Sequence, residues 1–329
     1  MIYNTEMLRE TNTLTLKNTL KNLEFGTKTS LAKLTGLSVA TCSNILGDLL
    51  KSGEVFELDL GEPKGGRPSR RFKYNFNFSL ILNMYLRKEN NEDYIFYRVN
   101  NLADELIEES SQNFLNLNLR DIHHLIERIT NNHLSIKTLT ISIPGVIHNG
   151  YIDTCDILTL EKINLKEFLS ENFSLKIRIE NDVNVLAYGS LSIGKTDMDN
   201  SSVYLYFPDL GDPGMGIIIN GKVILGNKNF AGEIKHLPIQ PKNLSAQMIQ
   251  SDKSVYTEYI YNIVKTVNAI INPGIITISC TNMNEEFELN LLKKLKMIKK
   301  IGQISFEKDI HDSLLLGLNY LSKIMTNEV

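Results

Sequence analysis

Hydrophobic positions follow mainly a helical period over about the first 53 residues, and from Phe76 the period changes to that of strands. In the segment that follows Ser38, apolar residues recur at i, i+3, i+4, i+7 and i+8, which places them on one stripe of a helix. The members of the stripe are Cys42, Ile45, Leu46, Leu49 and Leu50. The polar residues of the segment fall on the other side, so the pattern predicts an amphipathic helix.

Short signals on both sides of this helix define a small helical unit. A first helix is predicted at Leu31–Thr35, and Gly36 then supplies a turn that a residue with a Cβ enters at a cost. Ser38 is a favourable N-cap for the second helix, and Gly53 stands where a left-handed C-terminal residue is expected. Upstream, residues 5–25 are expected to be helical in two segments broken near Asn12.

Two predicted strands and a cationic loop follow the helices. The strands are Val55–Leu60 and Arg71–Asn75, and the loop at residues 64–71 reads KGGRPSRR, with no acidic residue. Helix, turn, helix and two-stranded wing are the outline of a winged helix-turn-helix, whose second helix enters the major groove of double-stranded DNA. The alternative is an ordinary three-helix core with a solvated basic loop.

On the winged-helix interpretation, the start of the second helix and the tip of the wing contact the operator DNA. Arg67 is the candidate minor-groove reader, because narrow minor grooves have the most negative potential. Lys64, Arg70 and Arg71 are the remaining basic candidates in the wing, the two arginines for phosphates. The candidates for base or phosphate contacts in the major groove are Ser38, Thr41, Ser43 and Asn44.

The part from residue 76 onward predicts two related α/β lobes. Expected strands are 78–86, 94–99, 104–109, 138–143, 176–180, 203–207, 216–220, 222–225, 275–279 and 302–306; expected helices are 119–130, 165–173, 183–191, 256–271, 289–299 and 310–325. This order is typical of mixed sheets covered by helices. We therefore expect domains at 1–75 and 76–329, the second with lobes of about 76–190 plus 310–329 and about 191–309. Clefts between lobes are usual ligand sites.

Composition limits the classes of function. The 329 residues are 42% hydrophobic and include three widely separated cysteines, which suggests neither a disulfide framework nor a metal knuckle. The N-terminus lacks the apolar core of a signal peptide and no run is long enough to span a bilayer, so a cytoplasmic protein is expected. Residues 1–75 hold 11 Lys and Arg against 8 Asp and Glu, whereas the remainder holds 24 against 30. A weakly basic head on an acidic body fits a DNA-binding module attached to a sensor.

Four short motifs in the body occur in a fixed order downstream of the GGRP loop. They are ISIPGV at 141–146 with Gly150, ENDVN at 180–184, the block GIIINGK at 216–222 with AGEIKH at 231–236, and NPGII at 272–276. Together they resemble the ROK family of repressors, open reading frames and sugar kinases, from about residue 138 onward. The resemblance implies a ribonuclease H-like, actin-like ATPase fold behind the winged helix.

The resemblance also implies a sugar-binding site. In family members that bind sugars, the residues matching Asn181, Asp182, Glu233 and His236 contact the hydroxyls. Carboxylates suit this task because they form charge-assisted hydrogen bonds with hydroxyl groups. Two ordinary interpretations stay open: Asp182 as an N-cap of the helix beginning at 183, and Glu233 with His236 as a surface pair.

Departures from the family pattern argue against an enzyme. A ROK kinase carries a DxGxT phosphate loop, but the matching segment SLILNMYLRK at 79–88 has neither glycine nor acid. The second phosphate loop is replaced by FPDLGDPGMG at 207–216, whose prolines remove N–H donors. The cysteine cluster of the family's zinc site is missing after His236. We therefore expect no kinase activity, no ATP site, no metal and no other cofactor.

These observations predict a transcriptional regulator of carbohydrate-related genes, most simply a repressor, that binds a two-fold operator as a homodimer or tetramer. A sugar or sugar phosphate is the expected effector. Lys235 replaces a family glycine and leaves open whether it blocks a sugar or attracts an anionic one. The alternatives are a ligand-independent regulator with a decayed sensor and a sugar kinase with a DNA-binding head.

Overall fold

The computed structural model describes residues 5–58, 69–89, 91–192, 201–209, 211–239, 250–280 and 283–326. It divides into two compact units. Met1–Leu80 together with Asn100–Glu105 form the first, and Ile81–Val99 with Leu106–Asn327 form most of the second. No described helix is both long enough and apolar enough to cross a membrane.

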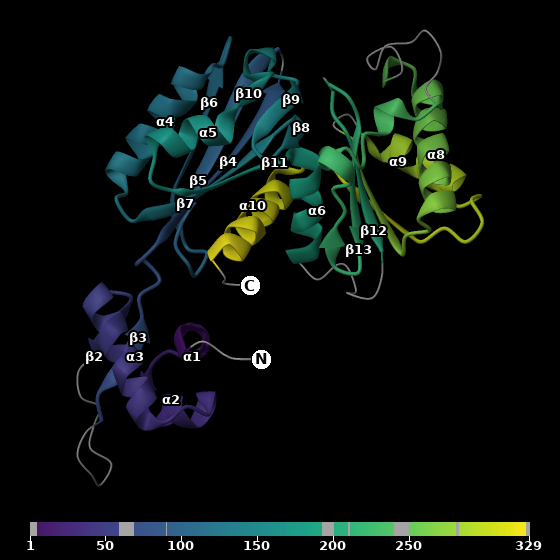
Figure 1. The fold of residues 1–329 in the computed structure, drawn as a ribbon. Helices are drawn as coiled ribbons and strands as arrows, with labels where there is room; N and C mark the ends of the chain where they lie inside the picture. Colours follow the sequence, from purple (N-terminus) through teal and green to yellow (C-terminus); the bar gives the residue numbers. More distant parts are fainter. Residues whose placement is uncertain are drawn as a thin grey trace. The chain divides into compact units, whose positions relative to one another are not determined.

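The first unit consists of three helices and a small antiparallel sheet (Figure 1). The helices are α1 (Thr5–Lys21), α2 (Lys28–Thr35) and α3 (Val39–Ser52), and the strands are β1 (Gly26–Thr27), β2 (Val55–Leu58) and β3 (Arg71–Tyr74) in the order β1-β3-β2. The predicted caps are confirmed: Ser38 accepts from the Thr41 N–H, and Gly36 and Gly53 have φ of 73° and 80°. The predicted stripe of α3 is buried except for Leu50, which is half-buried.

Two expectations for this unit were wrong. α1 is continuous through Asn12, because one asparagine costs a helix at most about 0.7 kcal/mol relative to alanine and the helix is packed through its buried residues Leu16 and Leu20. α2 begins at Lys28 rather than at residue 31, because Thr27 and Ser30 form a reciprocal capping box.

The second unit contains two five-stranded sheets. The first has the order β11-β7-β4-β5-β6, and its strands are β4 (Leu80–Glu89), β5 (Glu92–Asn100), β6 (Leu106–Phe114), β7 (Ile136–Ile143) and β11 (Lys176–Asn181). Helices α4 (Leu119–Asn132) and α5 (Leu165–Asn172) cover one face (Figure 1). A small sheet of β8 (Gly145–His148), β9 (Tyr151–Cys155) and β10 (Ile163–Asn164) follows β7 and was not predicted.

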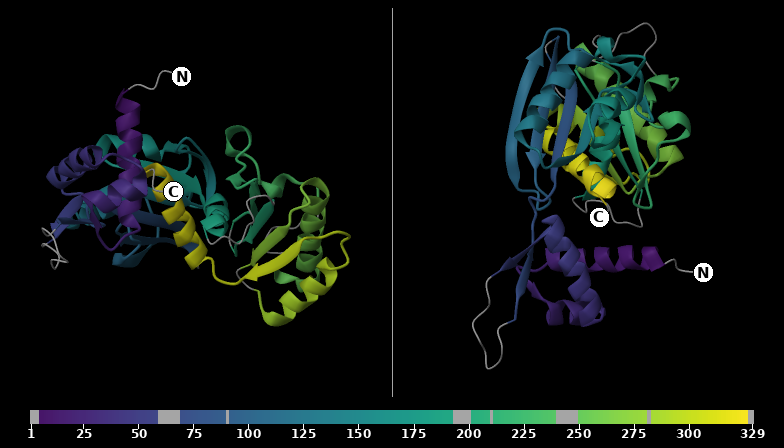
Figure 2. Two further views of the ribbon diagram at one scale, coloured as in Figure 1. Left: turned by 90° about the horizontal axis from the view of Figure 1, so that it is seen from below. Right: turned by 60° about the vertical axis from the view of Figure 1, so that its left-hand side comes forward.

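The second sheet has the order β14-β13-β12-β15-β16. Its strands are β12 (Ser202–Phe207), β13 (Gly214–Ile219), β14 (Lys222–Val223), β15 (Ile275–Cys280) and β16 (Gln303–Glu307). Alternate residues of β12 point to opposite faces: Val203, Leu205 and Phe207 pack with α8 (Lys253–Ile270) and α9 (Glu285–Leu295), whereas Tyr204 packs toward α6 (Asp182–Ser192) and α10 (His311–Thr326). Figure 2 shows α10, in yellow, beside strands of the second unit.

Candidate functional sites

The N-terminal turn of α3 presents a small polar surface to solvent. The Ser38 hydroxyl caps the helix through the Thr41 N–H at 3.0 Å, and the two hydroxyls are 2.8 Å apart. Asn44 is exposed on the next turn. Val39, which was not singled out from the sequence, is 48% exposed beside Ser38. Such a surface can offer hydrogen bonds and one apolar contact to base edges.

Two of the polar side chains on α3 already have partners within the unit. The Lys28 ammonium of α2 donates to the Ser43 hydroxyl at 2.7 Å. The Arg9 guanidinium of α1 pairs with Asp48 at 2.7 Å, beside a groove of about 670 Å³ between α1 and α3 that Thr41, Ser43 and Asn44 also line. Lys28 and Arg9 therefore join the candidate surface, although no sequence motif pointed to them.

The wing residues are only partly described. Lys64 and Arg67 lie outside the described residues. Arg70 is largely exposed and pairs with Glu57 of β2 at 3.0 Å. Arg71, in β3, is half-buried with its guanidinium over the Phe25 ring at 4.7 Å, so much of its surface is committed to the unit itself.

A cavity of about 240 Å³ lies within the second unit, where the loops after β7 and β11 meet the start of β13. Three of the four residues predicted to bind a sugar line it: Asn181, Asp182 and Glu233. His236 does not line this cavity; it is exposed, with its ring 5.2 Å from that of Phe230. The remaining lining residues that matter for its chemistry are Asp156, Glu161, Asp212 and Lys235.

The Asn181 side chain forms hydrogen bonds with two segments that line the cavity, the start of α6 and the loop after β7. Its side-chain oxygen accepts from the N–H groups of Val183 at 2.9 Å and Asn184 at 3.1 Å, which caps α6. Its amide donates to the Gly145 carbonyl at 2.6 Å, in the loop after β7. The capping role considered for Asp182 thus falls largely to Asn181, and Asp182 is the first residue of α6.

Three carboxyl groups of this cavity have raised pKa values, those of Asp156, Asp182 and Glu233. Burial raises the pKa of Asp182 to about 8, with a further contribution from the charge of Asp156. Burial also raises the pKa of Asp156 to about 6, helped by Asp212. For Glu233, burial raises the pKa against the opposing charges of Lys235 and His236. Desolvated carboxyl groups of this kind are typical of functional sites.

Lys235 lines the cavity, and its positive charge is balanced by an ion pair with Asp212. Its ammonium donates to an Asp212 carboxylate oxygen at 2.9 Å, which joins the 3₁₀ turn Ile234–His236 to the segment preceding β13. Burial alone lowers the pKa of Lys235, but the hydrogen bond and the negative charge of Asp212 outweigh it and raise that pKa. The cavity therefore offers carboxyl groups to a ligand more readily than a free cation.

Bulky side chains occupy β4 where a kinase of this resemblance would have a glycine-rich phosphate loop. Tyr85 is buried and its ring stacks on that of Phe96 at 5.2 Å. The Arg87 guanidinium lies over the rings of Tyr85 and Tyr94, at 5.4 and 5.0 Å. A backbone cradle for phosphate needs glycine at such positions so that N–H groups can approach the ligand.

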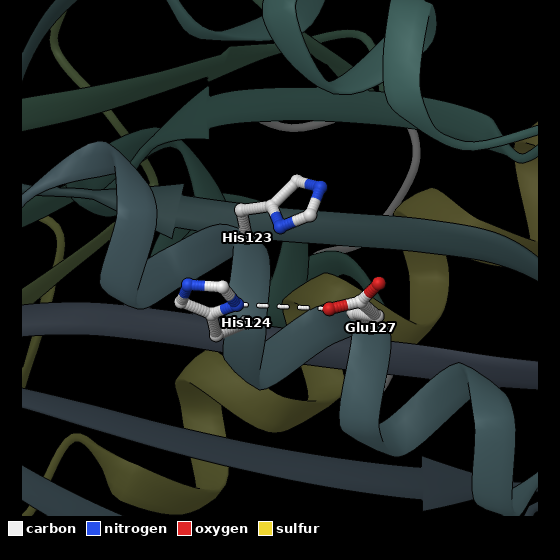
Figure 3. Close-up of side chains that lie close together, drawn as sticks. All are labelled: His123, His124 and Glu127. Carbon is white, nitrogen blue, oxygen red and sulfur yellow. Dashed lines mark ion pairs between the residues drawn. The ribbon is translucent and has the colours of Figure 1, made fainter.

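Three side chains of metal-binding type come together on α4, within the part of the chain that the structure describes (Figure 3). His123 packs near the Phe168 and Phe173 rings, while His124 and Glu127 are exposed and 3.6 Å apart. Exposed groups on neighbouring turns of one helix are ordinary surface charges, and we assign no site to them.

Comparisons with known proteins show which chains and folds this one is similar to. The model of the ROK family matches residues 98–247. The chain is similar to the xylose repressors of Caldicellulosiruptor bescii (28% identity over 247 residues) and Bacillus spizizenii (30% over 237 residues), covering 72% and 69% of this chain. It spans about 60% of the length of these curated relatives.

Two solved structures show the fold. A ROK family transcriptional regulator, a homologue of the E. coli MLC protein, superposes with a TM-score of 0.69 at 15% identity over 98% of both chains. A ROK hexokinase from Thermus thermophilus superposes with a TM-score of 0.61 at 14% identity, covering 76% of this chain and all of the hexokinase. At these identities the likeness concerns the fold alone.

Proposed function

We propose, from the match of residues 98–247 to the model of the ROK family, that the protein is a transcriptional repressor of carbohydrate genes. The first unit would bind DNA and the second unit would sense a sugar. The observation that carries the proposal is the likeness to a ROK transcriptional regulator over 98% of this chain, since it includes the first unit. The likeness to the ROK hexokinase covers only 76% of the chain, so it is less extensive than the likeness to the regulator.

The first unit supports a winged helix-turn-helix. Its helices α2 and α3 are joined by a left-handed glycine turn, and β2 and β3 pair in antiparallel behind α3. In this motif the second helix reads the major groove. We assign major-groove contacts to the exposed start of α3 and phosphate contacts to Lys28 and Arg70, with Arg67 of the loop in the minor groove. A homodimer or tetramer would place two such units on a two-fold operator.

The cavity of the second unit supports the proposal that this unit senses a ligand. The relatives named xylose repressor suggest a sugar as the effector class. A polyhydroxylated ligand needs several fixed donors and acceptors, and the cavity formed around Asp182 and Glu233 supplies them. A ligand that favours one arrangement of the repressor shifts its affinity for DNA, as binding linkage requires.

We further propose that the chain is not a kinase and needs no cofactor. Tyr85 and Arg87 occupy β4, where a phosphate loop needs glycine, and no cysteine follows His236 until Cys280. A sugar kinase with a DNA-binding head remains the alternative that the hexokinase likeness favours. ATP turnover in the presence of pentoses and hexoses would establish that alternative and refute ours.

DNA binding is tested by selecting bound sequences from a random duplex library and titrating the selected duplex by fluorescence anisotropy at fixed salt. We expect Arg67→Ala to weaken binding by about 1–3 kcal/mol and Asn44→Ala by a similar amount. Arg120→Ala, an exposed arginine on α4 of the second unit, is the control for loss of one positive charge. Absence of any selected sequence, or equal effects of all three variants, would contradict the proposal.

A further inference from the structure

We propose that the cavity of the second unit binds an uncharged sugar and rejects sugar phosphates, because the Lys235–Asp212 ion pair occupies the one lysine or arginine among the described lining residues. This inference rests on the proposed sensing function and specifies its ligand class. It also answers the question that the Gly-to-Lys difference at position 235 raised.

The cavity is surrounded mainly by acidic side chains. Five carboxyl groups line it, those of Asp156, Glu161, Asp182, Asp212 and Glu233, and Lys235 is the single lysine or arginine among the described lining residues. A phosphate group entering this space meets those carboxyl groups that have lost their protons, and like charges placed together cost several kcal/mol in a binding site. An uncharged polyol has no such penalty.

The basic side chains near the cavity already have partners or lie outside it. The Lys235 ammonium already donates to Asp212 at 2.9 Å, and its side chain is only 24% exposed. Lys88, whose charge reaches Asp156, lies 3.5 Å from Asp93 in β5. His236, the other basic group of the same turn, stacks near Phe230 outside the cavity. A phosphate would have to displace Asp212 in order to gain a cation.

The carboxyl groups of the cavity can form hydrogen bonds with sugar hydroxyl groups. A sugar hydroxyl both donates and accepts, and a carboxyl group that retains its proton does the same. Because their pKa values are raised, the carboxyl groups of Asp182 and Asp156 are partly protonated near neutral pH. Glu161 is less available, because its carboxylate accepts from the Cys155 N–H at 3.0 Å. Asp156, Asp182 and Glu233 are therefore the hydroxyl-binding groups.

The experiment measures ligand affinity for the full chain by isothermal titration calorimetry. The probes are D-xylose, D-glucose and N-acetyl-D-glucosamine, together with glucose 6-phosphate and N-acetylglucosamine 6-phosphate. We expect at least one neutral sugar to bind saturably, and the phosphates to bind at least about tenfold more weakly than the best neutral sugar. A phosphate that binds as tightly would overturn the inference while leaving the sensing function intact.

Substitution of the ion pair sharpens the test. Asp212→Asn keeps the size of the side chain but frees the Lys235 ammonium, so we expect affinity for the sugar phosphates to rise about tenfold while neutral-sugar affinity changes less than about threefold. In Asp212→Asn/Lys235→Met this gain is lost. Asp153→Asn, which breaks an exposed aspartate–lysine pair with Lys162 outside the cavity, is the matched control.

The outcomes separate the two proposals. An unchanged ratio of phosphate to neutral-sugar affinity in Asp212→Asn refutes the role of the ion pair even when a sugar binds. No binding by any probe, with operator binding retained, refutes both the sensing function and this inference and leaves a ligand-independent regulator. Circular dichroism of each variant confirms that the fold is retained before affinities are compared.

Discussion

Gly317 of α10 lies so close to Val185 of α6 that a Cβ on Gly317 would stand 1.9 Å from the Val185 carbonyl oxygen. The reverse contact is nearly as tight, since a Cβ on Gly189 of α6 would stand 2.3 Å from the Ser313 carbonyl oxygen. The two helices therefore cross backbone to backbone, within the buried cluster that includes Leu186, Leu314 and Leu318.

This crossing predicts that Gly317→Ala destabilises the second unit. An added methyl cannot be accommodated against a carbonyl oxygen without moving a helix, and overpacking of this kind costs about 1–3 kcal/mol. Gly47→Ala is the control, because Gly47 lies inside α3 with open space where a Cβ would stand, and alanine should there stabilise the helix by about 0.5–1 kcal/mol. Urea unfolding followed by circular dichroism measures both. Equal effects of the two substitutions would contradict the prediction.

Much of the fold could be predicted because local signals agreed with the long-range packing. In α3 the cap at Ser38, the apolar stripe and the glycine at position 53 all indicate the same helix. The break expected near Asn12 did not occur, because a single asparagine is a weak helix breaker and the packing of Leu16 and Leu20 outweighs it. The β8–β9–β10 sheet was missed because strands of two to five residues carry too little periodicity.

The cavity was predicted only where a motif marked it. Asp182 and Glu233 belong to recognisable blocks, but Asp156 and Asp212 stand in loops without a motif and reach the cavity through the fold of distant strands. The assignment of the α6 cap also needed the structure, because adjacent Asn181 and Asp182 are equally good capping residues in sequence. Only the geometry shows that Asn181 also reaches the Gly145 carbonyl.

Asn181→Ala should therefore destabilise the protein more than loss of one cap. The substitution removes two hydrogen bonds to the start of α6 and one to the Gly145 carbonyl, so we expect a cost of about 1–3 kcal/mol. Asn172→Ala is the control, since Asn172 is exposed at the end of α5 and its side-chain amide donates to the Phe168 carbonyl of the same helix. Chemical denaturation should show a much smaller effect there. A loss below about 0.5 kcal/mol for Asn181→Ala would count against its bridging role.

Glu54→Ala should destabilise the first unit. Glu54 is only 7% exposed, pairs with Lys17 of α1 and accepts from the Tyr74 hydroxyl of β3 at 2.9 Å, so it connects the first helix to the sheet. Removing it takes an acceptor from two largely buried groups, which costs about 1–3 kcal/mol. Glu57→Ala breaks the more exposed pair with Arg70 and should cost less than about 1 kcal/mol. Limited proteolysis, with cleavage mapped to residues 5–80, measures the two effects. Equal protease sensitivity of both variants would be inconsistent with a connecting role for Glu54.

The last prediction concerns pH. The folded-state pKa of Asp182 is about 8 against an ordinary value of 3.8, so between pH 4 and 8 the folded chain binds more protons at this group than the unfolded chain. Stability should therefore fall as pH rises through this window, by at most about 1.4 kcal/mol per pH unit for one group. Asp156, with a folded pKa of about 6, adds to the slope only below pH 6.

Asp182→Asn removes the titrating group and should flatten the dependence of Tm on pH between 6 and 8, raising Tm most at pH 8. Asp156→Asn should lower the pKa of Asp182 by removing a neighbouring charge, and thus move the steep region to lower pH. Asp153→Asn, outside the cavity, should retain the parental slope. Differential scanning calorimetry at matched ionic strength measures all four proteins. A parental slope in Asp182→Asn would contradict the assignment of this pH dependence to Asp182.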